Sequence, residues 1–316
     1  MRKMHRILLA LGALATSLAA TPPIAAPRAG PLATPPKALG AQLEVVPTGT
    51  PAHPAIWQVS DKDTTIFLFG TIHALPQGID WFGDRVASAF NGSQELVTEI
   101  VEADPAALQA SVRAKAMLPA GTTLRGMLTP AQRAKYDAAL TTYGIPVAAL
   151  DRFKPWYAAV FLSALPVLRD GYAAQNGVEE LLNTRAKAAH RPHSALETAQ
   201  YQLGLFDSLP LATQMRYLNE VVTDLPTARN QLGAMVEAWK RGDADTLARL
   251  MNEDQDEPEL MERLVTNRNK TWADWIKARL DKPGVVFVAV GAGHLAGAGS
   301  VQDQLRTRGI TASRVQ

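Results

Sequence analysis

Hydrophobic residues form short, nearly continuous runs at both ends of the chain beyond residue 54, and these runs predict β-strands. The segments "AIWQVS" and "TTIFLFG" are separated by the polar triplet Asp-Lys-Asp at 61–63, a pattern typical of a β-hairpin. "QELVTEI" predicts a further strand that ends at Glu99. "GVVFVAVGAGH" gives the strongest strand signal in the chain, and "ITASRV" predicts a last short strand.

Helical spacing of hydrophobic positions dominates the rest of the chain. A short helix is expected over 81–90, a mostly helical block follows over about 104–281, and another helix begins near residue 300. One exception is "RPHSALE", which predicts a short strand that delivers Glu197. Prolines divide the block, and we expect each to lie in a first helical turn or at a break rather than in a helix interior. They are Pro130, Pro146, Pro155, Pro166, Pro210 and Pro226.

Strands at both ends and helices between them predict an α/β fold. The simplest assembly is a central mixed sheet built from both ends of the mature chain, with a large helical insertion. We expect a single domain over residues 55–316, with the helical block at about 104–281. Trp239, Trp272 and Trp275 recur at helical spacing and are expected in the core or at an interface.

The first 54 residues have a different pattern. Arg2, Lys3 and Arg6 precede the apolar run "ILLALGALATSLAA", which is typical of a secretory signal peptide over residues 1–20. The run is short for a transmembrane helix, which needs about 20 apolar residues. An uncleaved N-terminal anchor is the alternative. Residues 21–54 are rich in proline and alanine and predict a disordered tether. We therefore expect a periplasmic or secreted protein with no stable membrane span after cleavage.

The composition of the chain excludes some classes of partner and of catalytic group. The net charge is only +2 and the basic residues form no stripe, so we expect no nucleic-acid partner. The chain has no cysteine, which suits a bacterial periplasm and excludes thiol nucleophiles and thiolate metal ligands. A metal ion would have to be held by His, Asp or Glu side chains.

The strands "FLFG" and "FVAVG" are each followed by the same short motif, Gly-x-x-His. The motif glycines are Gly70 and Gly291, and the histidines are His73 and His294. Functional groups of open α/β sheets collect beyond the carboxyl ends of strands, where Glu99 is also expected. One such histidine is more often a turn or core residue. Two copies in the same context, with a glutamate, predict a site at one edge of the sheet.

Two chemistries suit this combination. Two imidazoles and a carboxylate can hold a divalent ion that activates water. Without a metal, a histidine paired with a carboxylate can act as a general base. The residues alone leave both alternatives open.

Several segments carry a resemblance to the TraB/GumN family, which includes the TIKI proteins. They are "IWQVSDKDTTIFLFGTIHALP" with "LVTEI", "LETAQYQLGLFDSLP", "LVTNRNKTWADWIKARL" and "VFVAVGAGHLAGAGSVQDQLRTRG". The resemblance implies an erythromycin-esterase-like α/β fold. For TIKI-like members it implies a metal-dependent peptidase, with Mn, Co or Zn as the candidate ion. Relatives in the wider fold hydrolyse substrates through a histidine and a glutamate without a metal.

Position by position, the resemblance places the metal ligands at His73, Glu99 and His294. Glu197 and Arg268 match further family positions and complete the expected catalytic set. Glu197 has an alternative role as the cap of the helix that follows it. Arg268 is either a surface residue or a group that binds a substrate carboxylate or an oxyanion.

The leading hypothesis is an exported, metal-dependent peptidase that acts on a peptide or small-molecule substrate. One alternative is a periplasmic binding or regulatory protein that uses the same residues without catalysis. Another is a metal-free, esterase-type hydrolase. His190 and His193 are expected to be solvent-exposed and outside the site.

Overall fold

The computed structural model describes residues 49–101, 104–169, 172–252 and 258–316. The expected signal peptide and most of the expected tether (21–48 of 21–54) lie outside these residues. Within the described part of the chain, no helix is both long and apolar enough to cross a membrane.

A six-stranded mixed sheet forms the centre of the α/β fold, in the order β10-β2-β3-β9-β6-β8. The two pairs at the β10 end are antiparallel, and the pairs from β3 to β8 are parallel. This confirms the predicted mixed sheet built from both ends of the folded chain. The strands are β2 (Ile56–Ser60), β3 (Thr64–Thr71), β6 (Glu95–Thr98), β8 (His193–Ala195), β9 (Gly284–Gly291) and β10 (Ser313–Arg314).

Strands β3 and β9 are the two apolar runs that precede the Gly-x-x-His motifs, and they lie side by side. Their parallel register pairs Gly70 with Val290 and Thr71 with Gly291. Both strands are buried in the middle of the sheet, which explains why they read as continuous apolar runs rather than alternating ones. The register brings the ends of both strands to the same edge of the sheet.

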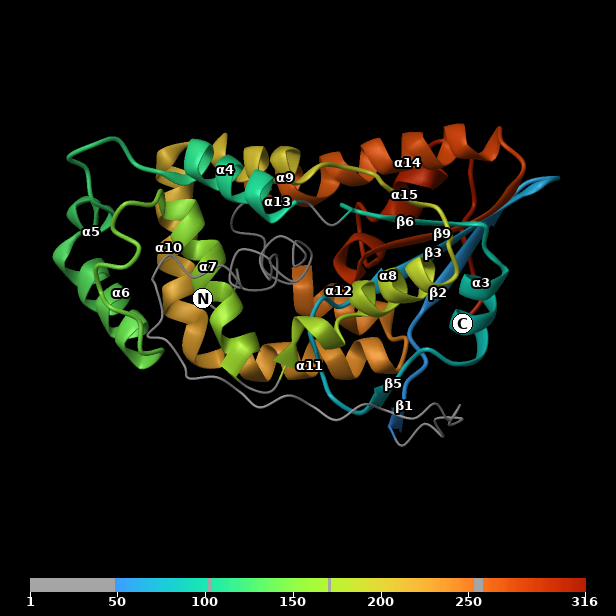
Figure 1. Cartoon of the computed structure of the whole chain (residues 1–316), viewed down its shortest axis with the longest axis horizontal. Helices are drawn as coiled ribbons and strands as arrows, with labels where there is room; N and C mark the ends of the chain where they lie inside the picture. The colour runs from blue at the N-terminus through green and yellow to red at the C-terminus, as the bar shows by residue number, and fades with distance from the viewer. Residues whose placement is uncertain (1–48, 102–103, 170–171, 253–257) are drawn as a thin grey trace, which may run out of the picture.

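Helices cover both faces of the sheet (Figure 1). One face packs against helices whose buried residues form a single hydrophobic cluster with Phe69 and Phe287. These helices are α3 (Asp84–Gly92), α8 (Val178–Ala188), α11 (Ala228–Lys240) and α12 (Ala244–Asn252). The other face packs against α14 (Asn267–Leu280) and α15 (Val301–Arg306), with Val288 and Trp272 in its core. The sheet is therefore the middle layer of three.

The remaining helices form a second body beside the sheet, with its own hydrophobic core. Figure 1 shows α5, α6, α7 and α10 at the opposite end of the elongated molecule from α3. These helices and their neighbours are α4 (Pro105–Ala116), α5 (Leu124–Met127), α6 (Pro130–Thr142), α7 (Pro155–Arg169), α9 (Ala199–Asp207), α10 (Leu211–Asp224) and α13 (Pro258–Met261). The predicted helical block thus divides: part of it covers the sheet and part forms this second body.

Two-stranded pairings complete the described fold around the loops that follow β3. β4 (Leu75–Pro76) pairs with β7 (Tyr172–Ala173), and β1 (Thr50–Pro51) pairs with β5 (Ile79–Asp80). The β4–β7 pairing brings the chain just after His73 next to the segment that leads into α8. This contact positions half of the candidate site.

Helix α7 departs from the sequence prediction. Pro166 lies inside it, although we expected each proline at a first turn or a break. A proline in a helix interior gives up one backbone hydrogen bond. Trp156, Ala158 and Leu162 of the same helix are 0% exposed, so burial of this helix in the second core outweighs the local cost.

Candidate active site

The two Gly-x-x-His motifs meet at the carboxyl edge of β3 and β9. A Cβ atom on Gly70 would lie 3.0 Å from the Cα of Ala292, inside the second motif. The first motif therefore needs glycine so that the two turns can approach each other closely. The carbonyl oxygen of Gly70 also accepts a buried hydrogen bond of 2.8 Å from Nε1 of Trp239.

From this shared edge the two histidines turn toward different helices. His73 lies against Glu179 of α8, on one face of the sheet, whereas His294 lies against Arg268 and Asn269 of α14, on the other. Both histidines are buried, with exposed fractions of 6% and 0%. The structure places them at the predicted edge, but in two neighbouring clusters.

The first cluster is a histidine–carboxylate pair. Nδ1 of His73 lies 2.6 Å from Oε1 of Glu179. The hydroxyl of Thr71 donates a hydrogen bond to the same oxygen, so two groups from the end of β3 fix this carboxylate. Nε2 of His73 is buried and has no hydrogen-bonding partner among the described residues. The ring is thus paired with a carboxylate through Nδ1, whereas the buried Nε2 has no partner among the described residues.

The protonation of His73 depends on its charged neighbours. Burial by itself lowers the pKa of His73, because it penalises the charged imidazolium. The carboxylate of Glu179, assisted by that of Glu99, outweighs burial and raises the pKa above its ordinary value of 6.5. Arg268 acts in the opposite direction. His73 therefore responds electrostatically to both clusters.

A close backbone contact sets the position of Glu179. Gly177 is the N-cap of α8, and the N–H of Val178 donates a 3.0 Å hydrogen bond to the carbonyl oxygen of Ile72. A Cβ atom on Gly177 would lie only 2.2 Å from the carbonyl oxygen of His73. The φ of Gly177 is −63°, which any residue can adopt. Glycine is needed here for space rather than for conformational freedom.

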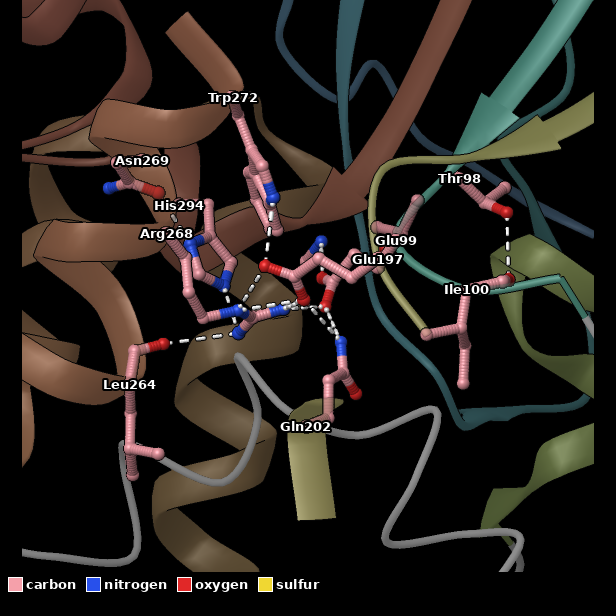
Figure 2. Close-up of polar contacts among 12 residues, drawn as sticks. Thr98, Glu99, Ile100, Glu197, Gln202, Leu264, Arg268, Asn269, Trp272 and His294 are labelled. Carbon is pink, nitrogen blue, oxygen red and sulfur yellow. Dashed lines mark hydrogen bonds and ion pairs between the residues drawn. The ribbon is translucent and has the colours of Figure 1, made fainter. Parts of the chain in front are cut away.

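Arg268 is the centre of the second cluster (Figure 2). Its Nε and Nη2 donate to the carboxylate of Glu197 at 2.8–3.0 Å, and Nη2 also donates to Oε2 of Glu99 at 2.5 Å. Nη1 lies 3.1 Å from the carbonyl oxygen of Leu264 and 3.1 Å from Nε2 of His294. All five guanidinium N–H groups are used, and the side chain is 0% exposed. Burial excludes the surface alternative for Arg268, and in this arrangement all of its donors are engaged within the protein.

A break in regular helical bonding gives Arg268 one of these partners. A π-helical turn, Glu262–Thr266, lies between α13 and α14, and the N–H of Asn267 bonds to the carbonyl oxygen of Glu262. Such turns often occur at functional sites because they change which backbone groups are paired. Here the carbonyl oxygen of Leu264, within the turn, accepts from the guanidinium of Arg268.

Hydrogen bonding assigns the tautomer of His294. The amide nitrogen of Asn269 donates to the carbonyl oxygen of Gly299 at 2.8 Å, so its Oδ1 is the atom that faces the imidazole. Oδ1 lies 2.6 Å from Nδ1 of His294 and can only accept. Nδ1 therefore carries the proton, and Nε2 accepts from Arg268. The lone pair that a metal would need is already engaged.

Both carboxylate oxygens of Glu99 are also engaged. Oε1 accepts a 2.8 Å bond from the backbone N–H of Gly291, and Oε2 accepts from Arg268 and from Nε2 of Gln202. Burial by itself raises the pKa of Glu99, but Arg268 is the main group that reverses this effect, and the pKa falls to about 2. Glu99 is therefore an anchored anion between the two clusters.

Glu197 makes contacts that differ from the expected cap. Thr198 is the N-cap of α9, whereas the carboxylate of Glu197 accepts from Arg268, from Nε2 of Gln202 and from Nε1 of Trp272. Trp239 and Trp272 are buried as predicted, and Trp272 additionally contributes this bond to the site.

Some residues of the two clusters were not predicted. Glu179 and Gln202 lie on helices far from both motifs in the sequence, and nothing in their local pattern marks them. His193 was expected in solvent, but it lies in β8, where its Nε2 is 2.8 Å from the hydroxyl of Thr98. The segment "HSA" pairs with β6 in parallel, which confirms the short strand predicted over "RPHSALE".

The expected metal ligands were tested against this geometry. Glu99 and His294 direct their donor atoms at a guanidinium or at backbone and amide hydrogens. His73 faces Glu179 instead. Among the described residues, no group of three or more His, Asp or Glu side chains is placed to hold a metal ion. In this arrangement the nitrogen and oxygen atoms of these side chains are not placed to bind a metal ion, and the mechanism proposed below uses none.

These features define an α/β protein with a buried histidine–carboxylate pair beside a carboxylate–guanidinium cluster. Residues 55–314 match the model of the TraB/PrgY/gumN family, and the chain belongs to this family, as the sequence resemblance predicted.

Two relatives show how far the similarity extends. The chain is 28% identical over 243 residues to the uncharacterized protein YbaP of Escherichia coli (strain K12), covering 76% of this chain and 87% of that protein. It is 23% identical over 272 residues to an uncharacterized protein of Treponema pallidum (strain Nichols), covering 80% of each. No solved structure matches the chain.

The contact at Gly177 predicts the effect of one added methyl group. Gly177→Ala should lower the free energy of unfolding by about 1–3 kcal/mol, because the new Cβ must push α8 away from His73. The matched control is Gly83→Ala, since Gly83 is the N-cap of α3 and has no atom within 4 Å of an added Cβ. Urea denaturation of both variants checks this, and equal stability would contradict it.

The anchored anion predicts a pH-dependent stability difference. The folded-state pKa of Glu99 is about 2, below its ordinary 4.5, so its charge stabilises the fold above pH 4.5, and this stabilisation is lost as pH falls through about 2. Glu99→Gln should cost about 3 kcal/mol at pH 7 because it leaves Arg268 with one charged partner fewer. The difference from wild type should shrink between pH 4.5 and 2.

Urea denaturation across this pH range measures the difference. The control is Glu237→Gln, because Glu237 is 57% exposed and pairs only with neighbouring Lys240 among the described residues. Its effect should stay small at every pH. A Glu99→Gln deficit that is the same at pH 7 and near pH 2 would contradict the assignment.

Proposed function

We propose that this protein is a hydrolase in which His73 acts as a general base on a water molecule. One observation carries the proposal: Nδ1 of buried His73 is anchored by Glu179, while Nε2 has no partner among the described residues. A base oriented through one nitrogen and open at the other is the arrangement that proton abstraction from water requires. No other histidine of the described sheet edge has a nitrogen left open in this way, since His294 uses both.

The reaction begins with neutral His73, because only the neutral ring has a lone pair on Nε2. Nε2 takes a proton from water as the hydroxyl oxygen attacks a carbonyl carbon of the substrate, and the proton moves to the leaving group when the bond breaks. The carboxylate of Glu179 stabilises the imidazolium formed in between. The charge of Glu99 acts in the same direction.

The other residues of the two clusters have positioning roles in this proposal. Thr71 orients Glu179 through its hydroxyl. Arg268 holds Glu99 and Glu197 together and donates to His294, and Asn269 fixes the imidazole of His294. These groups fix the loops that carry the base and keep an anion near it.

A peptide or a small ester or amide is the substrate class that we propose, since each offers a carbonyl carbon to an activated water. The metal-dependent form of the hypothesis is not carried forward, because Glu99 and His294 have no free donor atom. Export to the periplasm also remains a proposal, supported by the charged start and the apolar run of residues 1–20.

Two substitutions test the base. With a panel of p-nitrophenyl esters and fluorogenic peptides, His73→Ala should lower kcat/KM roughly 100- to 10,000-fold, which is the usual contribution of a general base. In the wild type, kcat/KM should rise with pH through a midpoint above 6.5, because the pKa of His73 is raised and only its neutral form is active. Glu179→Gln should move this midpoint down, because burial, which lowers the pKa, then acts without the carboxylate.

The matched control is His53→Ala. Nδ1 of His53 lies 3.7 Å from Oδ2 of Asp84, and its side chain is 61% exposed. It should leave both the rate and the pH midpoint unchanged. Full activity of folded His73→Ala on every substrate that the wild type cleaves would refute the proposal. A wild type that binds peptides but cleaves none of the panel would favour the binding-protein alternative.

A further inference from the structure

The second cluster surrounds a cation that belongs to the chain itself. Arg268 is 0% exposed and lies among two carboxylates, a histidine nitrogen and a backbone carbonyl oxygen. Buried charges persist only when they are paired and hydrogen-bonded, and this guanidinium meets both conditions. The family resemblance instead implies a divalent ion that two of the same residues would hold.

The hydrogen-bond acceptors around Arg268 match the planar arrangement of N–H groups on a guanidinium. Glu197 faces the edge formed by Nε and Nη2, Glu99 approaches Nη2, and His294 and Leu264 approach Nη1 (Figure 2). Such bidentate contacts match the geometry of a guanidinium rather than that of a point charge. The acceptors lie around the edge of a plane, which agrees with the absence of a metal-binding group among the described residues.

An aromatic ring completes the receptor. The guanidinium carbon of Arg268 lies 4.7 Å from the ring centroid of Trp272, within cation–π range. Nε1 of Trp272 donates 2.9 Å to Oε1 of Glu197, which fixes both the ring and the carboxylate. The same ring lies 4.4 Å from the imidazole of His294. Glu197, Trp272 and His294 are thus each held by a contact besides the one with Arg268.

We propose that this cluster is a guanidinium receptor whose resident ligand is Arg268, and that it replaces a divalent metal as the cation of the site. The inference does not rest on the proposed hydrolase, because it concerns the stability of the folded protein and its ligand selectivity. The ligand class is a planar guanidinium cation. Divalent metal ions are the class that the receptor does not take.

Removal of the side chain tests the selectivity. Arg268→Ala leaves two buried carboxylates without their cation, so its melting temperature should fall well below that of the wild type. Millimolar guanidinium or methylguanidinium chloride should raise the melting temperature of this variant, because a ligand that binds only the folded state stabilises it. Mn²⁺, Co²⁺ and Zn²⁺ at the same concentration should not.

Two controls separate specific rescue from general salt effects. Sodium chloride at matched ionic strength should not restore Arg268→Ala. Arg152→Ala removes a guanidinium that, within the described ranges, donates only to the carbonyl oxygens of Leu118, Pro119 and Thr122. Without carboxylates at that position, guanidinium should not restore Arg152→Ala.

Further measurements keep the proposal testable if Arg268→Ala does not fold. Arg268→Lys retains the positive charge but loses the planar set of guanidinium N–H groups, so this variant should also melt below the wild type. A wild-type melting temperature for Arg268→Lys would overturn the proposal. Wild-type protein treated with EDTA should keep its melting temperature. The proposal would also be overturned by stoichiometric metal in the purified wild type whose removal lowers the melting temperature, or by rescue of Arg268→Ala with a metal ion and not with guanidinium.

Discussion

The buried ion pairs between Arg268 and two glutamates are the interaction on which the rest of the site depends. Glu99 follows β6, Glu197 follows the neighbouring β8, and the arginine comes from α14. A charge removed from water is costly unless its partners compensate it fully. Because each of the three residues needs the other two, their loops can adopt few other arrangements. This constraint fixes the end of the sheet at which His73 lies.

Sheet register supplies the second half of the arrangement. The parallel pairing of β3 and β9 brings the two Gly-x-x-His turns together from opposite ends of the chain, and Gly70 lets them touch. The turns then diverge, because α8 offers a carboxylate on one face and α14 offers an amide and a guanidinium on the other. The repeated motif thus places its two histidines in different environments. Nε2 of His73 has no partner among the described residues, whereas Nε2 of His294 accepts a hydrogen bond from Arg268.

Much of the fold could be predicted from the sequence, for identifiable reasons. The two central strands, β3 and β9, are long apolar runs near opposite ends of the folded chain, so the hydrophobic pattern alone indicated a mixed sheet built from both ends. The strand-end pattern indicated a site with His73, Glu99 and His294 at one edge of the sheet, and the family resemblance added Glu197 and Arg268. The partner of His73 could not be predicted, because Glu179 contacts it only through tertiary packing at Gly177. Pro166 was misplaced for a similar reason, since burial of α7 is a property of the folded chain.

The assignment of separate roles to the two histidines is the central claim of this account, and their ring protons report it. Nitrogen-15 NMR of the imidazoles at neutral pH tests it most directly, with His73→Ala used to assign the signals. We predict that His294 carries its proton on Nδ1, with Nε2 showing the shift of a hydrogen-bonded acceptor. A proton on Nε2 of His294 would contradict the account, because Arg268 could then not donate to it and the cluster would have to be arranged differently.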